Sequence, residues 1–211
     1  MYGLLNFICL ILFSVAFSIL YALSVQPARL ERRIGEKAYA RCGVYRKAGT
    51  VPMYIAMVNF ILYRWFPLSW DPFPARFPWP YWVNAVVAAV IGIPAVTVMI
   101  RGVRDAGSET MSPEKHHTMY GGIYEKIRHP QALGEAPIWI VVAFLLNLPF
   151  LAVFSLLYLP VWYWWCLVEE RDLLLRYGEA YAEYRKRTGM FLPRKPRKEM
   201  KETQGCRRNR T

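Results

Sequence analysis

The chain has 211 residues, of which 55% are hydrophobic and 16% aromatic, and its formal net charge is +12. The length suits one domain, but the composition is too apolar for a soluble protein and predicts an all-α, multi-pass membrane protein. Nucleic-acid binding is disfavoured, because no soluble domain carries a basic stripe interleaved with aromatic residues. The four cysteines have no CxxC spacing and therefore predict neither a metal site nor a disulfide framework.

Five apolar stretches are long enough to cross a hydrocarbon core of ~30 Å. They are residues 2–25, about 49–66, 81–100, about 131–148 and 149–168. The first stretch ends in a sequence like a signal-peptide cleavage site, but its apolar run is too long and lacks a basic start, which favours a retained helix. Asn147-Leu148 predicts a tight turn that makes the last two stretches an antiparallel hairpin. Pro94, Pro137 and Pro160 predict kinks inside their helices.

Basic residues are distributed unevenly between the connecting segments. Segment 26–48 carries seven, 101–130 carries five and everything after 168 carries thirteen, against two, Arg64 and Arg76, on the opposite side. Because Lys and Arg stay cytoplasmic, the N-terminus is predicted outside and the C-terminus in the cytosol.

The chain then divides into three predicted parts. Residues 1–100 form three membrane helices, and residues 101–193 form a second half that contains the hairpin. Residues 194–211 form a basic, disordered tail that lies near anionic lipid headgroups or is simply solvated. Apolar residues recur at helical spacing over residues 169–186 and predict a helix there. This helix is expected to lie on the membrane surface or to fold back over the polar residues described below.

Residues 120–130 place charge directly before the fourth apolar stretch, where it costs free energy. Pro130 suits the first turn of a helix, so Arg128 and His129 stand at a helix N-terminus, which attracts carboxylates and phosphates. Gly121-Gly122 allows the backbone to approach a ligand closely. The alternative is that Arg128 and His129 are interfacial residues that contact lipid headgroups.

A second polar cluster, Glu169-Glu170, follows the fifth apolar stretch. On a helix Glu170 shares a face with apolar residues, so its carboxylate is expected to point inward, where it would bind a ligand or pair with Arg128. The alternative is an acidic first turn that favours a helix dipole. Glu135 is either a site residue or a residue at headgroup level. Residues 162–165 form either an aromatic cage for a cation or an interfacial aromatic belt, which is the simpler interpretation.

These motifs together resemble the superfamily of isoprenylcysteine carboxyl methyltransferases and phospholipid methyltransferases. The resemblance covers about residues 101–193 and rests on two separate motifs in the right order across a membrane hairpin. Asp105-x-Gly107 and His116 also look like family positions. The motifs are Gly122-Ile123-Tyr124-x-x-Ile127-Arg128-His129-Pro130 and Glu169-Glu170-x-x-Leu173 with Tyr177-Gly178, Tyr181 and Tyr184.

The resemblance implies that S-adenosylmethionine binds from the cytosol at the mouth of the hairpin. It implies catalytic roles for Arg128, Glu169 and Glu170. The two glutamates would hold polar groups of the cofactor, and an acceptor would lie near Glu135, Trp162 and Trp165. The other residues implied to line the cofactor pocket are His116, Met119, Gly122, Tyr124, His129 and Pro130.

The chain departs from the family pattern in four places, one of which is a shorter link between Asp105-x-Gly107 and His116. Thr118-Met119 replaces an aliphatic pair, and Ala132 stands where an aromatic residue is common. The run Trp162 to Cys166 has no arginine, which members acting on prenylcysteine tend to carry there for the acceptor carboxylate. This departure concerns the acceptor more than the methyl donor.

The expected function is therefore S-adenosylmethionine-dependent methyl transfer to a lipid-like acceptor in the membrane. The acceptor is an isoprenylcysteine or similar carboxylate, or a phospholipid amine. A carboxylate needs no general base, whereas an amine would pass a proton to Glu135 or Glu169. One alternative is a nicotinamide-dependent lipid or sterol reductase. Another is a non-catalytic protein whose tail recruits partners, in which case deletion of residues 194–211 abolishes function. The sequence indicates no oligomeric state.

Overall fold

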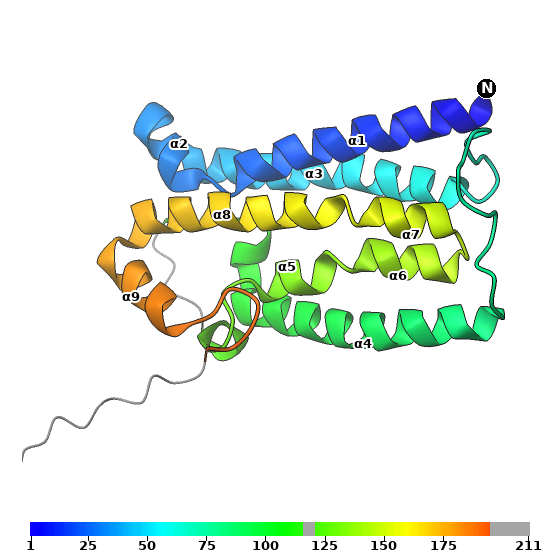
Figure 1. Cartoon of the computed structure of the whole chain (residues 1–211). Helices are drawn as coiled ribbons and strands as arrows, with labels where there is room; N and C mark the ends of the chain where they lie inside the picture. Colours follow the sequence, from blue (N-terminus) through cyan, green and yellow to red (C-terminus); the bar gives the residue numbers. More distant parts are fainter. Residues whose placement is uncertain (116–120, 195–211) are drawn as a thin grey trace, which may run out of the picture.

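The computed structural model describes residues 1–115 and 121–194. Its long helices lie side by side along one direction, and the short helices α2 and α9 gather at one end (Figure 1). The all-helical class predicted from the sequence is confirmed for these residues. The α-helices are α1 (Tyr2–Ser24), α2 (Pro27–Ile34), α3 (Lys37–Leu62), α4 (Tyr81–Ala106), α5 (Pro130–Glu135), α6 (Ile138–Leu145), α7 (Pro149–Ser155), α8 (Tyr158–Tyr177) and α9 (Glu179–Arg187), and two short 3-10 helices are η1 (Gly107–Thr110) and η2 (Gly122–Glu125).

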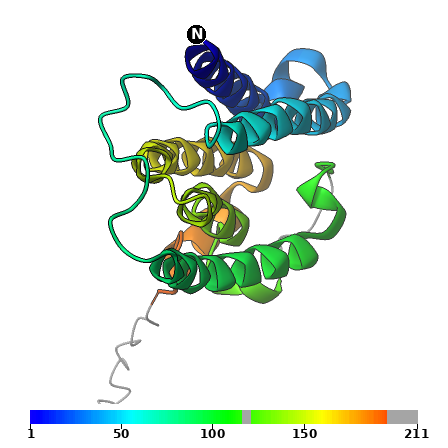
Figure 2. The same cartoon turned by 90° about the vertical axis from the view of Figure 1, so that its right-hand side faces the viewer.

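Seen from the end of the bundle, the helices form successive layers (Figure 2). α1 packs on α3, and α8 packs on α1. α6 packs against both α7 and α4. Three helical stretches among the described residues are long and apolar enough to cross a membrane. They are Tyr2–Ser24, Tyr81–Thr110 and Pro149–Tyr177, while the apolar stretch Pro130–Leu145 is shorter.

Two of the three prolines inside the expected spans coincide with helix breaks. Pro137 separates α5 from α6, and α7 ends just before Leu156, whose carbonyl would be the hydrogen-bond partner of residue 160. Proline has no N–H to donate to that carbonyl, so the helix opens one turn before Pro160. Pro94 lies within α4, which runs unbroken from Tyr81 to Ala106.

Two expected boundaries are wrong. α3 begins at Lys37 rather than near residue 49, so segment 26–48 is helical in α2 and α3 instead of a loop. Hydropathy does not predict this helix start, because Lys and Arg end an apolar window although both residues are good helix formers. No new helix begins at Glu169 either, since α8 runs through to Tyr177 and ends at Gly178, whose φ of 57° terminates it.

Small residues let α4 approach the α5–α6 segment closely. A Cβ atom on Gly134 would lie 2.4 Å from the Ala95 carbonyl oxygen, and one on Gly102 would lie 3.0 Å from the Gln131 side chain. Both contacts would be shorter than ordinary van der Waals distances. The backbone of α5 is therefore held against α4, which fixes the position of the residues that begin α5.

At the end of the bundle opposite α2 and α9 (Figure 1), side-chain amides tie α4 to the turn between α6 and α7. Asn84 is fully buried and donates through Nδ2 to Asn147 Oδ1 at 2.8 Å, while Trp79 Nε1 donates to Asn84 Oδ1 at 2.6 Å. Asn147 has a φ of 59°, which asparagine tolerates better than most residues, and makes the predicted hairpin turn between α6 and α7.

Candidate functional site

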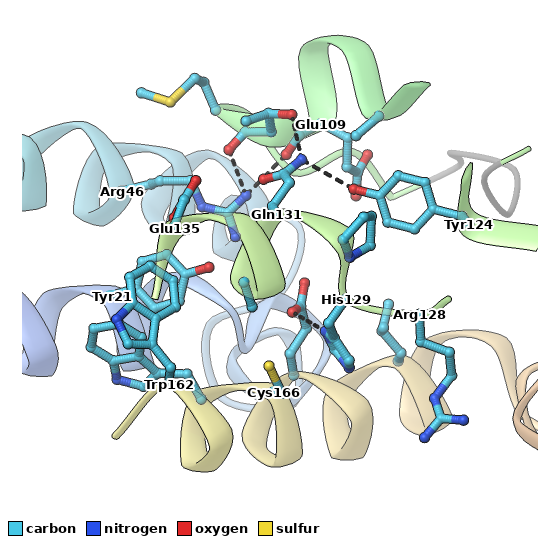
Figure 3. Close-up of a pocket in the computed structure, with 18 of the residues that line it drawn as sticks. Tyr21, Arg46, Glu109, Tyr124, Arg128, His129, Gln131, Glu135, Trp162 and Cys166 are labelled. Carbon is cyan, nitrogen blue, oxygen red and sulfur yellow. Dashed lines mark hydrogen bonds and ion pairs between the residues drawn. The ribbon is translucent and has the colours of Figure 1, made fainter. Parts of the chain in front are cut away.

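A cavity lies at the end of the bundle where α2 and α9 gather. Its volume is about 230 Å³, slightly below the range of typical ligand pockets, which is about 300–1,000 Å³. Its walls come from α1, α3, the end of α4, η1, η2, α5, α8 and α9, so segments far apart in the sequence meet there. In the close-up, Tyr21, Glu135 and Trp162 gather at one side and Arg128 and His129 at the other (Figure 3).

The two polar clusters predicted from the sequence meet at one side of this cavity. Arg128 Nε donates to Glu170 Oε1 at 2.7 Å, and His129 Nε2 lies 3.2 Å from the same oxygen. His129 Nδ1 lies 3.4 Å from Glu169 Oε2. The side chains of Arg128, His129 and Glu170 are 8%, 5% and 6% exposed, whereas that of Glu169 is 35% exposed. Glu170 is therefore buried in the cluster, and Glu169 faces the cavity.

His129 is held in the form that carries a proton on both ring nitrogens. Only the imidazolium donates from both nitrogens, and each nitrogen faces a carboxylate oxygen. Burial opposes its charge, but hydrogen bonds to Cys166, Glu169 and Glu170 outweigh burial and raise the pKa of His129 well above its ordinary value. Two buried positive charges thus face two carboxylates, and the half-exposed Arg185 adds a third cation, its Nε 3.7 Å from Glu170 Oε2.

The chain after α9 returns to cover this cluster. The Arg128 N–H donates to the Gly189 carbonyl at 2.9 Å, and the His129 N–H donates to the Met190 carbonyl at 3.1 Å. Arg128 Nη1 also donates to the Thr188 carbonyl. We call residues 188–191 the strap. Its carbonyls satisfy buried donors that the start of α5 would otherwise leave unpaired.

Arg46 ties three elements together at the opposite wall. It makes four hydrogen bonds, to Ser24 Oγ at 3.3 Å, to the Ser24 carbonyl at 3.4 Å, and to the carbonyls of Glu109 and Thr110 at 2.9 Å each. η1 is held further by a buried ion pair in which Arg176 Nη1 lies 2.6 Å from Glu109 Oε1. These contacts fix η1 as a wall of the cavity.

Tyrosines form the cavity wall between the strap and η1. The Tyr184 hydroxyl donates to the Tyr124 carbonyl at 2.7 Å, and the Tyr124 hydroxyl accepts from Gln131 Nε2 at 3.1 Å. Burial raises the pKa of Tyr184 to about 12, so it stays a donor at physiological pH. The hydroxyl of Tyr181 and Nε1 of Trp165 are buried and have no hydrogen-bond partner among the described residues.

Aromatic rings close the other side of the cavity. Trp165 lies 4.5 Å from Tyr21, 4.8 Å from Trp162 and 5.3 Å from Phe17, measured between ring centroids. We call these four residues the ring cluster. All four line the cavity, together with Glu135 of α5.

A second cavity, of about 210 Å³, adjoins the first and is lined almost entirely by apolar side chains of α1, α3, α6, α7 and α8. Phe17, Trp162 and Trp165 line both cavities. Three members of the ring cluster thus line both a cavity that carries charged groups and a cavity that is almost wholly apolar. Apolar residues that line the second cavity include Ile11, Val15, Leu157 and Val161.

Most residues singled out from the sequence lie at the first cavity. Gly122 and Glu170 are not among its lining residues, and His116 and Met119 lie outside the described residues. Gly122 packs instead against Asp105, which accepts a hydrogen bond from the Ile123 N–H at 2.8 Å. The lining residues singled out beforehand are Tyr124, Arg128, His129, Pro130, Glu135, Trp162, Trp165 and Glu169.

Other lining residues were missed by sequence reasoning. Arg46, Thr50 and Met53 line the cavity from α3 at spacings of four and three residues, which is one face of a helix. The sequence contains this pattern, but an apolar window that stops at basic residues cuts α3 near residue 49 and so separates Arg46 from Thr50 and Met53. Tyr21 and Glu109 carried no comparable signal, since each depends on contacts across the bundle.

No protein-family model, no curated protein and no solved structure matches the chain.

Proposed function

We propose that this protein is an integral membrane methyltransferase that uses S-adenosylmethionine and acts on a lipid-like acceptor. The observation that supports it best is the pair of adjoining cavities, one lined by charged as well as aromatic and apolar side chains, the other almost wholly by apolar ones, which share Phe17, Trp162 and Trp165. A reaction between a polar donor and a lipidic acceptor requires this combination, because each reactant needs its own environment. The two motifs that resemble the methyltransferase superfamily also converge on the first cavity.

The residues of the first cavity fit S-adenosylmethionine. Glu169 offers a part-exposed carboxylate for hydroxyl or ammonium groups, and the buried Tyr181 hydroxyl and Trp165 N–H lack partners within the described part of the chain. Orphaned buried polar atoms are costly unless a ligand or water satisfies them. His129 and Tyr124 line the same cavity. We assign these residues to the cofactor.

The proposed topology has five membrane crossings, by α1, α3, α4, the α5–α6 segment and the α7–α8 segment. The distribution of basic residues supports an outside N-terminus and a cytosolic C-terminus. Both α9 and the cavity then lie at the cytosolic end of the bundle. A water-soluble cofactor would enter from the cytosol and a lipid from the bilayer.

When bound, the cofactor supplies a methyl group on a positively charged sulfur. The work of the protein is to position the acceptor in line with this methyl group and to exclude water. Arg128 and Glu170 hold the start of α5 in place through their 2.7 Å contact. His129 fixes one oxygen of Glu169, which leaves the other oxygen for the ligand.

Calorimetry on the purified full-length protein in detergent tests the proposal. S-adenosylmethionine and its demethylated product should both bind, and Glu169→Gln should weaken binding by roughly tenfold through the loss of a charged hydrogen bond. The matched control is Glu183→Gln, which changes a glutamate with 61% side-chain exposure on α9 and should leave binding unchanged.

Absence of binding by either compound would refute the proposal. A parallel titration with reduced nicotinamide adenine dinucleotide phosphate addresses the reductase alternative. If this compound binds and S-adenosylmethionine does not, the reductase is favoured. Removal of residues 195–211 should leave cofactor binding intact, whereas a protein that works only through its tail would lose its function.

A further inference from the structure

We propose that the protein binds a phosphate group in a third cavity, of about 410 Å³, which lies between α2, α3 and the last turn of α8. We call it the α2 cavity. No described residue that lines it also lines either of the other two cavities, so it is separate from the site assigned to S-adenosylmethionine. α2 and the end of α8 lie at the same end of the bundle (Figure 1). The residues that carry the proposal are Glu31, Arg32, Tyr39, Lys115 and Arg176, all of which line the α2 cavity.

The first observation is a buried guanidinium that is only partly satisfied. The side chain of Arg176 is 5% exposed, and its Nη1 lies 2.6 Å from Glu109 Oε1. Its Nε and Nη2 are buried and have no hydrogen-bond partner among the described residues. Buried N–H groups without an acceptor are costly, and a ligand or an ordered water normally satisfies them. A small rotation of the guanidinium would turn both nitrogens toward an acceptor held in the α2 cavity.

The buried carboxylates near Arg176 already have donors of their own. Glu109 accepts from Arg176 through Oε1 and from the Glu114 N–H through Oε2, at 2.6 and 3.1 Å. Asp172 accepts from two backbone N–H groups in the first turn of α2, at 3.0 and 2.7 Å, which joins α8 to α2. Neither carboxylate is among the described residues that line the α2 cavity. The two remaining nitrogens of Arg176 therefore need an acceptor from elsewhere.

The rest of the lining adds further donors. Arg32 is exposed and makes no hydrogen bond or ion pair with any described residue, and the Tyr39 hydroxyl has no hydrogen-bond partner in the same part of the chain. Lys115 Nζ lies 2.6 Å from Glu31 Oε1. Glu31 is the one carboxylate among the described lining residues, and it is taken up by Lys115. The case for an anion thus rests on unpaired donors on several walls, and not on net charge.

Aromatic rings hold Arg176 in position. Its Cζ lies 5.5 Å from the centroid of the Tyr39 ring and 4.9 Å from that of the Tyr177 ring. Arginine stacks on aromatic faces, and its planar fork of N–H groups matches the oxygens of phosphate and carboxylate. A side chain that is already held in place loses little conformational entropy when a ligand binds.

The arrangement of the donors favours phosphate over carboxylate. A phosphate monoester carries about −1.5 to −2 charges at pH 7 and has three strong acceptor oxygens. The donors come from α2, α3 and α8, so they approach from several directions, whereas the two oxygens of a carboxylate lie in one plane. The cavity volume also leaves room for a group attached to the phosphate. Two sources offer this chemistry, which are the headgroup of an anionic lipid and a soluble phosphate compound.

Calorimetry on the full-length protein in dodecylmaltoside tests the proposal without any methyl donor. The probes are inorganic phosphate, dihexanoyl phosphatidic acid and dihexanoyl phosphatidylcholine, whose phosphate is a diester with a single negative charge. Phosphatidic acid should bind at least tenfold more tightly than phosphatidylcholine. If it also binds at least tenfold more tightly than inorganic phosphate, the source is a lipid headgroup, whereas comparable affinities indicate a soluble phosphate.

Variants that remove one donor each locate the bound probe. Arg32→Gln should weaken its binding roughly tenfold, and Tyr39→Phe about fivefold, because these changes remove a charged and a neutral hydrogen bond. The matched control is Arg33→Gln, an exposed neighbour on α2 that does not line the cavity, which should stay within twofold of the unchanged protein. Arg176→Gln should weaken binding tenfold or more, and its unfolding free energy is measured alongside, because this change also removes the contact with Glu109.

Three results would overturn the proposal. The first is that neither inorganic phosphate nor phosphatidic acid binds to the unchanged protein. The second is an equal loss of affinity in Arg32→Gln and Arg33→Gln, because the attraction would then be a general property of a basic helix. The third is unaltered affinity in both Arg32→Gln and Tyr39→Phe, whether or not Arg176→Gln folds. Failure to bind S-adenosylmethionine, by contrast, would refute the methyltransferase and leave the phosphate site standing.

Discussion

Replacement of Glu170 by leucine tests whether the buried cluster at the start of α5 holds the site together. The change leaves Arg128 and His129 buried with the loss of contacts at 2.7 and 3.2 Å. Removing one partner of a buried charge pair costs about 3–5 kcal/mol. Arg128 keeps its carbonyl partners and His129 keeps Glu169, so we expect about 3 kcal/mol, at the lower end of this range.

Glu170→Gln separates the charge from the hydrogen bond. The amide oxygen of glutamine still accepts from Arg128, so only the difference between a charged and a neutral hydrogen bond is lost. This difference is about 1 kcal/mol. The order of stability should therefore be unchanged protein, then Glu170→Gln, then Glu170→Leu.

The assay is equilibrium unfolding in mixed micelles of dodecylmaltoside and increasing sodium dodecyl sulfate, followed by tryptophan fluorescence. The control is Glu183→Leu, at an exposed position on α9, for which no measurable change is expected. A loss below about 1 kcal/mol for Glu170→Leu, within the range of a surface ion pair, would refute the view that this cluster is a buried support of the site.

Three further predictions concern pH and packing. The raised pKa of His129 stabilises the fold fully below its unfolded value of about 6.5, and this contribution should fall as the pH rises and vanish above the folded-state pKa. The unfolding free energy of His129→Gln should lack this decline, and parallel curves for the two proteins would contradict it. Gly122→Ala, at a φ of 63° and with a Cβ that would clash with the Asp105 carboxylate, should cost more than about 1 kcal/mol in the same mixed-micelle unfolding assay. Gly121→Ala, at a φ of −99°, should be tolerated. Asn84→Ala should cost about 1–3 kcal/mol because it leaves the Trp79 N–H unpaired, and cofactor binding measured by calorimetry should not change.

Local rules were sufficient for the parts of the fold that depend on one segment. The bounds of α1, the start of α4 and the turn at Asn147 follow from apolar run length and turn chemistry, and the structure has them where they were expected. The start of α3 at Lys37 was missed, since apolar windows stop at basic residues although helices do not.

The site could be predicted only where two sequence motifs were expected to lie close together in the fold. Arg128 and His129 were expected near the two glutamates, and the structure brings them together. Helical periodicity predicted that Glu170 points inward, and the structure buries it against Arg128. That Glu169 is the glutamate that lines the cavity depends on the elements packed around α8, which periodicity does not describe. The strap could not be foreseen either, because its contribution comes from backbone carbonyls, which have no signature in side-chain identity.

The strap also has a consequence for the order in which the protein matures during synthesis. Arg128 and His129 find their backbone partners at Gly189 and Met190, about sixty residues later in the chain. At a translation rate of about 5–20 residues per second, several seconds separate the emergence of these two halves. All the helices of the bundle are made before the start of α5 receives its last carbonyls. A nascent chain released before residue 188 would thus insert its helices and still lack a finished site.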